Sequence, residues 1–418
     1  MPGYVSPPSS APADGADAST KAVPDGVGPL LVTLLMAGSC LPILGAVLLA
    51  PVLPKMQDHF EGVAGAKALV PVVLSIPALA LALLAPFAGV VIDRLGRKRL
   101  LVVAAVLYSL FGTAPLWLDS LGAIVASRAL VGVCEAAIMT CCTTLIGDYF
   151  TGRARDRFLA LQTVCASASA TAFFVLGGAI GSAGWRAPFW LYAVGLLLAP
   201  AMAAFLPRPR SVDAPELHAA TRPEARPFPV RKMAGICTLS VFGGIVFYAV
   251  PVETAYLLDD LGVESSGVIG LATALASAAT VAGCIVFARL SGRPERRLPA
   301  ILVLCAAGFA VMALAGTPAV LIAGAVLNCV GTGLLLPSLL TWGMSKLEYA
   351  DRGRGTGLWT AAFFFGQFVC PLVLIAVASV IGSLAAAIGL LGLATAVVAS
   401  GLLLALRGAV AVAESPRL

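Results

Sequence analysis

The stretch Gly89-Val-Val-Ile-Asp93-Arg94-Leu-Gly96-Arg97-Lys98-Arg99 decides the fold, because it puts a short, strongly basic turn between two long apolar runs. A helix that crosses a bilayer needs about 20 apolar residues, and Lys and Arg concentrate in the loops on the cytoplasmic side. The stretch therefore predicts a cytoplasmic hairpin between two membrane helices, with Gly96 in the turn.

The composition indicates an all-α membrane protein. Of the 418 residues, 60% are hydrophobic and only 11% are charged, and a soluble protein cannot hide that much apolar surface in one core. The net charge of +6 does not indicate nucleic-acid binding, because the cations are confined to loops. The ten cysteines lie in apolar runs without a C-x-x-C pair, and His59 and His218 are far apart, so we expect no metal site.

Twelve apolar runs predict twelve transmembrane helices in two six-helix pseudo-repeats, an architecture known from transporters. Short matches support the repeat: Ala50-Pro51-Val52 and Asp148-Tyr149 recur as Val250-Pro251-Val252 and Glu348-Tyr349. The expected helices lie near 29–50, 69–92, 99–118, 121–147, 157–182, 186–206, 233–257, 266–290, 297–316, 318–345, 355–382 and 384–406. The predicted organisation is a disordered cytoplasmic tail (1–28), an N-terminal bundle (29–206), a cytoplasmic linker (207–232), a C-terminal bundle (233–406) and a second cytoplasmic tail (407–418).

The loop charges predict the orientation. With the N-terminus in the cytoplasm, all but four of the 27 Lys and Arg fall in cytoplasmic segments, the exceptions being Lys55, Lys67, Arg128 and Arg186. We therefore expect both termini in the cytoplasm. The chain is expected to be an integral protein of a bacterial inner (plasma) membrane.

The pattern G-x-x-x-D-R-x-G-R-[K/R] from Gly89 onward resembles the signature loop of the major facilitator superfamily, which lies between the second and third helices of that family. The resemblance implies a transporter rather than an enzyme, with no cofactor. It also implies a conformational latch that closes in one state and breaks in the other, with a solvated structural loop as the alternative. The latch residues are Gly89, Asp93, Arg94, Gly96 and Arg97, with Asp148 as the partner of Arg97.

Arg128 and Glu135 are ionisable residues in the fourth predicted helix. Seven residues make about two turns, so the two side chains share one face. An ionisable residue at mid-membrane depth costs roughly 2.5–3.5 kcal/mol on insertion scales and usually has a partner or a water-filled cavity. The run from Arg128 to Ala136 resembles the helix 4 motif of the superfamily and is similar to its spinster-type lysolipid transporters. We expect Glu135 to bind protons with Arg128 setting its affinity; a purely structural pair is the alternative.

Other polar residues in the apolar runs are weaker candidates. Glu253, late in the seventh helix, is a second candidate for proton coupling or else a solvated carboxylate at the rim of the bundle. Gln162, Asn328 and Gln367 are candidates for the substrate cavity, although each of them could equally bridge two helices.

Two further motifs resemble the drug–proton antiporter branch of the superfamily. They are Pro51-Val-Leu-Pro54 and the glycines Gly177, Gly178 and Gly181. The sequence thus predicts proton-coupled export of a small apolar or amphiphilic solute by a monomer whose partners are that solute, protons and the lipid bilayer. The alternatives are an importer or facilitator, a lysolipid carrier of the same fold, and a non-transporting receptor or scaffold. A phosphate-binding G-x-x-x-x-G-K-[S/T] loop does not occur, so we expect no ATP drive.

Overall fold

The structure is a computed structural model that describes residues 28–88, 95–207, 230–290, 292, 294–348 and 351–414, with the backbone alone for 230–232 and 408–414. Its described part is helical, without strands, and contains 12 helices that are long and apolar enough to cross a membrane. The predicted fold class is therefore confirmed. The predicted tail and linker lie almost entirely outside the described residues.

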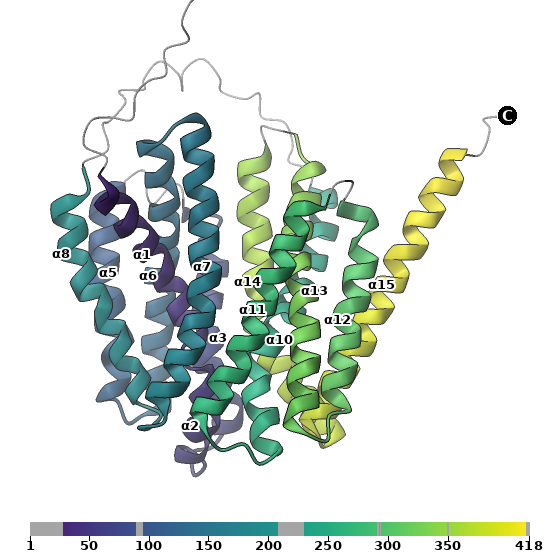
Figure 1. Cartoon of the computed structure of the whole chain (residues 1–418), viewed down its shortest axis with the longest axis horizontal. Helices are drawn as coiled ribbons and strands as arrows, with labels where there is room; N and C mark the ends of the chain where they lie inside the picture. Colours follow the sequence, from purple (N-terminus) through teal and green to yellow (C-terminus); the bar gives the residue numbers. More distant parts are fainter. Residues whose placement is uncertain are drawn as a thin grey trace, which may run out of the picture.

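The helices form two groups that lie side by side, one from each half of the chain (Figure 1). In its described part, the first half contains α1 (Pro29–Val47), η1 (Ala50–Val52), α2 (Leu53–His59), α3 (Ala66–Leu84), α5 (Arg97–Thr113), η2 (Ala114–Leu116), α6 (Leu121–Tyr149), α7 (Gly152–Gly181), η3 (Ala187–Ala193) and α8 (Val194–Phe205). The second half consists of α10 (Val230–Asp260), α11 (Ser266–Arg289), η4 (Pro294–Arg296), α12 (Leu298–Ala313), α13 (Pro318–Ser345), α14 (Arg352–Ile381) and α15 (Leu384–Glu414).

Two of the expected helix ends differ from the structure at a proline. The chain does not leave the first helix at Ala50 but continues through η1 and α2 to His59, because Pro51 interrupts the α-helical hydrogen bonding without stopping the helical path. The next helix, α3, ends at Leu84 and is followed by the turn around Pro86, short of the expected residue 92. Pro86 has no backbone N–H to donate to the carbonyl one turn before it, which accounts for the early end.

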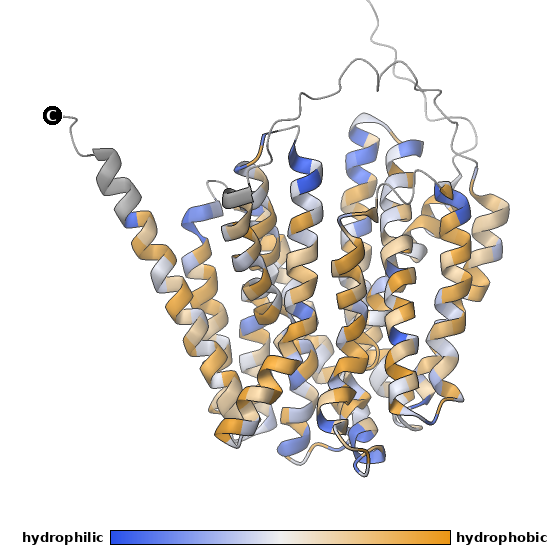
Figure 2. Ribbon diagram, turned by 180° about the vertical axis from the view of Figure 1, so that it is seen from behind, coloured by the Kyte–Doolittle hydropathy of each residue, from blue (hydrophilic) through white to orange (hydrophobic). Residues whose placement is uncertain are grey.

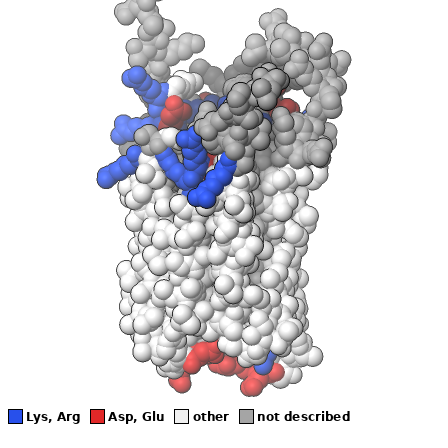
Figure 3. Space-filling model, turned by 90° about the vertical axis from the view of Figure 1, so that its right-hand side faces the viewer, with Lys and Arg blue, Asp and Glu red and all other residues white. Residues whose placement is uncertain are grey.

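A hydrophobic band surrounds the middle of the molecule, and hydrophilic residues gather at its two ends (Figure 2). The charges at the two ends have opposite signs (Figure 3). One end, called the basic end here, carries the described cations Arg97, Lys98, Arg99, Arg153, Arg155, Arg157, Arg289, Arg296, Arg297, Lys346, Arg352, Arg354 and Arg407. The other, called the acidic end, carries Asp58, Glu61, Asp119, Asp259, Asp260 and Glu264, with Lys55, Lys67 and Arg186. The described part of the chain is therefore strongly asymmetric across the hydrophobic band.

The two halves meet where α7 packs against α11 and α3 against α14. Gly178 and Gly270 allow the first crossing: a Cβ on Gly178 would lie 2.5 Å from the Ser266 carbonyl oxygen, and a Cβ on Gly270 would lie 2.5 Å from the Phe174 carbonyl oxygen. Small residues permit such close approach of helices in a membrane. The buried residues of α7 all lie in its last third, between Phe174 and Gly181. The α7–α11 seam is thus closed at the acidic end and open toward the basic end.

Candidate functional site

Arg128 and Glu135, here called the buried charge pair, lie two turns apart on α6, with 0% and 1% of their surfaces exposed. Between them, Gly132 brings α6 against α3, since a Cβ there would lie 2.5 Å from the Pro77 Cα. Two ionisable groups are therefore enclosed by protein in the middle of an apolar bundle. Ionisable groups inside membrane proteins are rare and usually belong to a functional site.

The Arg128 guanidinium is held by backbone carbonyls of two neighbouring helices. Its Nη2 donates a hydrogen bond of 2.7 Å to the Gly45 oxygen on α1, and its Nε donates one of 3.2 Å to the Val73 oxygen on α3. The guanidinium also lies over the ring of Tyr192, 5.0 Å from the ring centroid, where a cation is attracted by the aromatic face. The cation is therefore fixed in place, but its Nη1 has no hydrogen-bond partner.

The Glu135 carboxyl lies against the backbone of Gly45. A Cβ at that position of α1 would overlap the Oε1 atom of Glu135, so only glycine leaves room for the carboxyl. The Oε1 atom is buried without a hydrogen-bond partner. Gly45 therefore contacts both members of the buried charge pair. Its carbonyl accepts the hydrogen bond from Arg128, and the Glu135 carboxyl lies against its Cα.

Arg128 and Glu135 form no ion pair within 4 Å, although both side chains belong to the described part of the chain. An unbonded guanidinium N–H and an unbonded carboxyl oxygen are costly when buried. They are also free to act: the carboxyl can gain or lose a proton at Oε1 without breaking a hydrogen bond there, and Nη1 can donate to a polar group that enters. Chemically the pair suits binding of a proton or of a polar group of a solute.

Tyr248 reaches this region from the second half. Its hydroxyl, on α10, lies 3.0 Å from the Ala46 oxygen on α1 and 3.3 Å from the Leu74 oxygen on α3. A hydroxyl has one proton, so it donates to one of these carbonyls at a time. Ala46 directly follows Gly45, so a single turn of α1 touches the buried charge pair on one side and the second half on the other.

The structure places the other predicted polar residues in three kinds of surroundings. Glu253 on α10 is buried, not solvated at a rim, and its Oε1 has no partner. Gln162 on α7 donates to Ser39 Oγ at 2.8 Å and Thr143 Oγ1 at 3.2 Å, which ties α7 to α1 and α6. Asn328 donates to the Cys305 oxygen at 3.0 Å inside the second half, and Gln367 is buried on α14. A role for them in solute binding stays a prediction.

Half of the predicted latch falls outside the described residues, namely Gly89, Asp93 and Arg94. Gly96 has φ 82°, a left-handed conformation that favours glycine. Arg97 forms an ion pair with Asp148, which joins α5 to α6 within the first half. Close by, Gly357 on α14 lies against Ala85 and Pro86, so the beginning of α14 is next to the end of α3.

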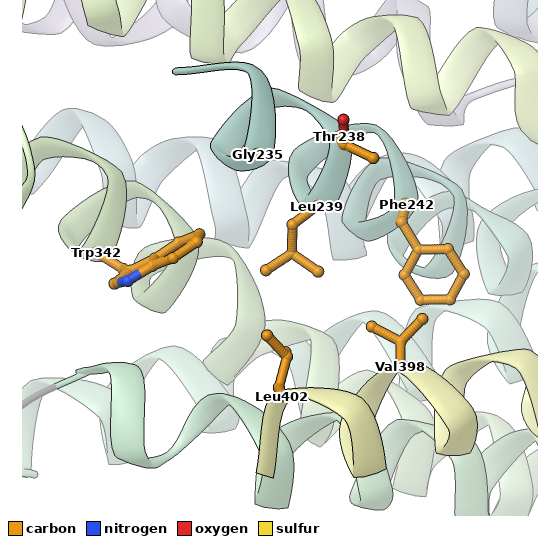
Figure 4. Close-up of a pocket in the computed structure, with 7 residues that line it drawn as sticks. All are labelled: Gly235, Thr238, Leu239, Phe242, Trp342, Val398 and Leu402. Carbon is orange, nitrogen blue, oxygen red and sulfur yellow. The ribbon is translucent and has the colours of Figure 1, made fainter. Parts of the chain in front are cut away.

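A groove of about 480 Å³ lies within the second half, between α10, α13 and α15, apart from the buried charge pair. Leu239 and Leu402 point at each other across it, with Trp342 at one end and Phe242 and Val398 at the other (Figure 4). Thr238, whose hydroxyl donates to the Ala234 oxygen, and Gly235 complete the lining. The groove offers no charged group and suits only an apolar chain.

Sequence reasoning found both charged residues of the site but missed Gly45, Tyr192 and Tyr248. Charge in an apolar run is visible in a sequence. Nothing distinguishes Gly45 among the 43 glycines, or these two tyrosines among the 7, because their importance comes from contacts between helices that are distant in the chain.

The sequence model of the Major Facilitator Superfamily matches residues 35–371 of this chain. Multidrug resistance protein 1 of Bacillus subtilis (strain 168) is 28% identical over 179 residues, which are 41% of this chain and 43% of that protein. Multidrug resistance protein 2 of the same organism is 28% identical over 182 residues, 41% of this chain and 42% of that protein. The match thus spans less than half of each relative.

Two solved structures share the fold. The human organic anion transporter MFSD10 (TETRAN) superimposes with a TM-score of 0.65 at 16% identity, over 90% of this chain and 99% of that one. A bacterial homologue of the human lysosomal transporter Spinster, in an inward-facing and occupied conformation, gives a TM-score of 0.67 at 14% identity, over 90% and 96% of the two chains. At these identities the likeness concerns the fold alone.

Proposed function

Because the chain belongs to the major facilitator superfamily, we propose that it is a secondary transporter that exports a small apolar or amphiphilic solute in exchange for protons. Two six-helix bundles would turn against each other and open a central site to each side alternately. The single observation that carries the proton coupling is the buried charge pair, because Glu135 is an enclosed carboxyl with an unbonded oxygen beside a fixed cation.

The relatives support the direction of transport, and the described charges support the orientation of the protein in the membrane. The two Bacillus proteins are named for multidrug resistance, which favours efflux of apolar compounds. The concentration of cations at the basic end supports a cytoplasmic position for that end. We propose that both termini and the linker are also cytoplasmic, and that the membrane is a bacterial inner membrane. A cysteine in the linker of a Cys-less variant should then resist an impermeant thiol reagent added outside intact cells.

The proposed proton coupling depends on Glu135, so a single substitution of this residue tests it. When Glu135 binds a proton, the site loses a negative charge. The proton acts as a ligand, and a ligand that binds one conformation better shifts the population toward that conformation. The purified monomer in proteoliposomes should move members of a panel of lipophilic cations and amphiphiles, ethidium among them, faster when a pH gradient is imposed. Glu135→Gln should abolish the gain from the pH gradient while exchange of the same compound stays measurable.

The comparison variant is Glu253→Gln. Normal pH-driven transport in Glu135→Gln together with loss in Glu253→Gln would move the proton site to α10. Full pH-driven activity in both variants and in the double variant would refute coupling through these residues. Transport that ignores the pH gradient in the unaltered protein would favour a facilitator, lysolipid uptake would favour a lipid carrier, and no transport of any compound would favour a receptor or scaffold.

A further inference from the structure

The end of α10 carries a series of polar residues near the acidic end. Glu253, Tyr256 and Asp259 follow one another at intervals of three residues, so each lies about 4.5 Å further along the axis and is a neighbour of the one before it on the helix surface. Five residues before Glu253, the same helix carries Tyr248, which contacts α1 beside the buried charge pair. The series therefore leads from the acidic surface toward the middle of the bundle.

Two of these residues hold a buried oxygen atom that has no hydrogen-bond partner. Glu253 is 2% exposed and its Oε1 has no hydrogen bond, and the Tyr256 hydroxyl is likewise enclosed and unbonded. Native proteins satisfy nearly all buried polar atoms, and each exception calls for an explanation. Two such exceptions at neighbouring turns of one helix leave both groups able to give or take a proton without breaking a hydrogen bond at these atoms.

The Tyr256 hydroxyl lies between the buried carboxyl and the acidic surface. Glu253, Asp259 and Asp58 are all close enough to act on it electrostatically. Asp58 belongs to α2 of the first half, which packs against α10, so carboxylates of both halves lie near the hydroxyl. Asp260 and Glu264 extend the acidic group around Asp259, and Figure 3 shows acidic residues gathered at this end of the molecule.

The nearby basic groups turn elsewhere. Lys55 on α2 donates to the Gly181 oxygen at 3.3 Å, and the His59 ring packs on Trp185 with 5.2 Å between ring centroids. From α14, the Cys370 thiol is close enough to Glu253 for the two groups to interact electrostatically. In the described part of the chain, no cation thus neutralises the path from the acidic surface to Glu253.

We propose that Asp58 and Asp259 collect protons at the acidic end and that the Tyr256 hydroxyl passes them to Glu253. In the transfer step, rotation of the side chains brings the carboxyls into hydrogen-bond contact with the Tyr256 hydroxyl, which has no hydrogen-bond partner in the structure. The Tyr256 oxygen then accepts a proton from a protonated Asp259 or Asp58 carboxyl while its own proton moves to the Glu253 carboxylate. One O–H bond breaks and one forms at the tyrosine, which ends neutral and ready for the next proton. The proposal rests on the proposed function, because the path gives the coupling proton its entry route. Tyr256 is a relay and not a proton-binding site.

The test reads the protonation of Glu253 directly and needs no solute. Dicyclohexylcarbodiimide crosses membranes and reacts with protonated buried carboxyls, so its labelling of Glu253, measured by peptide mass spectrometry, reports proton occupancy. The full chain is reconstituted in liposomes in one orientation, with different pH values in the two compartments. Lowering the pH by one unit at the acidic end alone should raise labelling several-fold, up to about tenfold, whereas the same change at the basic end should not.

Two variants examine the relay itself. Tyr256→Phe should remove most of the dependence on the pH at the acidic end, and Asp259→Asn should weaken it. The matched control is Asp119→Asn, which changes an acidic-end carboxylate that pairs with Arg186 instead; it should leave the labelling unchanged. Glu253→Gln removes the labelled group, and thermal unfolding of each variant checks that it is folded.

Labelling that follows the pH of the basic end would overturn the proposal, and so would an unchanged response in folded Tyr256→Phe. Neither result depends on solute transport. If no compound is transported but Glu253 still follows the acidic-end pH, the proposed function fails and the proton path stands. If pH-driven transport occurs while Glu253 ignores the acidic end, the path fails and the proposed function stands.

Discussion

The backbone of Gly45 touches both members of the buried charge pair. Its carbonyl accepts the Arg128 hydrogen bond, and its Cα leaves the space that the Glu135 carboxyl fills. Interiors are packed closely enough that one extra methyl group is felt. A residue with no chemistry of its own thereby determines where the only acidic side chain of α6 buried in the bundle can lie.

Gly45→Ala should therefore impair proton coupling while the protein still folds. The new methyl group displaces the Glu135 carboxyl at a cost of about 1–3 kcal/mol, and we expect most of the pH-driven transport of the panel compounds to be lost. The matched control is Gly38→Ala on the same helix, where a Cβ would meet the flexible end of Met202 at 2.7 Å. Equal activity in both variants would show that the position of the carboxyl is unimportant.

At the scale of single residues, the sequence predicted those residues whose chemistry differs from that of the apolar residues around them. Arg128, Glu135 and Glu253 stand out because charge is rare in apolar runs, and their burial follows from the cost of exposing it to lipid. The partners of Arg128 could not be predicted, because two of them are backbone carbonyls, which every residue has. Only the relative positions of α1, α3 and α6 select Gly45 and Val73.

Among the elements, α10 connects the most parts of the molecule. It carries Tyr248, which bonds to α1 and α3, and farther along Glu253 and Tyr256, and its end packs against η1 and α2. The sequence predicted a helix over 233–257, already through Pro251, and α10 continues to Asp260. Proline is tolerated inside membrane helices when neighbouring groups satisfy the freed carbonyl.

Tyr248→Phe should weaken closure at the acidic end. Loss of one hydrogen bond between the halves is worth about 0.5–1.5 kcal/mol, which shifts the balance between the closed and open states about two- to tenfold. Spin labels on Val63→Cys and Ser265→Cys, in acidic-end loops of the two halves, should show a larger population at long distance in a Cys-less background. Tyr149→Phe, which removes a hydroxyl bonded to the Pro207 oxygen at the basic end, should leave that population unchanged.

At the scale of the whole molecule, the sequence predicted the fold well because it depends on composition. Long apolar runs, basic loops and the stretch at Gly89 determine twelve helices in two halves. The conformation could not be predicted in this way, because it depends on which end of the seam is closed. The structure shows the α7–α11 seam closed toward the acidic end at Gly178 and Gly270, with Tyr248 joining the halves in the middle of the bundle. The residues expected to close the basic end include Asp93, outside the described part.

A transporter that alternates between two states needs both of them populated, which makes a prediction for paired substitutions. Asp93→Asn should weaken closure at the basic end, adding to the population that the structure shows, and should slow exchange of a transported panel compound. Tyr248→Phe acts at the opposite end and shifts the balance the other way. The double variant should therefore exchange faster than Asp93→Asn alone, whereas Asp93→Asn combined with Tyr149→Phe should not. If the double variant is slower than either single variant, the two ends are not coupled through one equilibrium, and Asp93 acts as part of a structural loop.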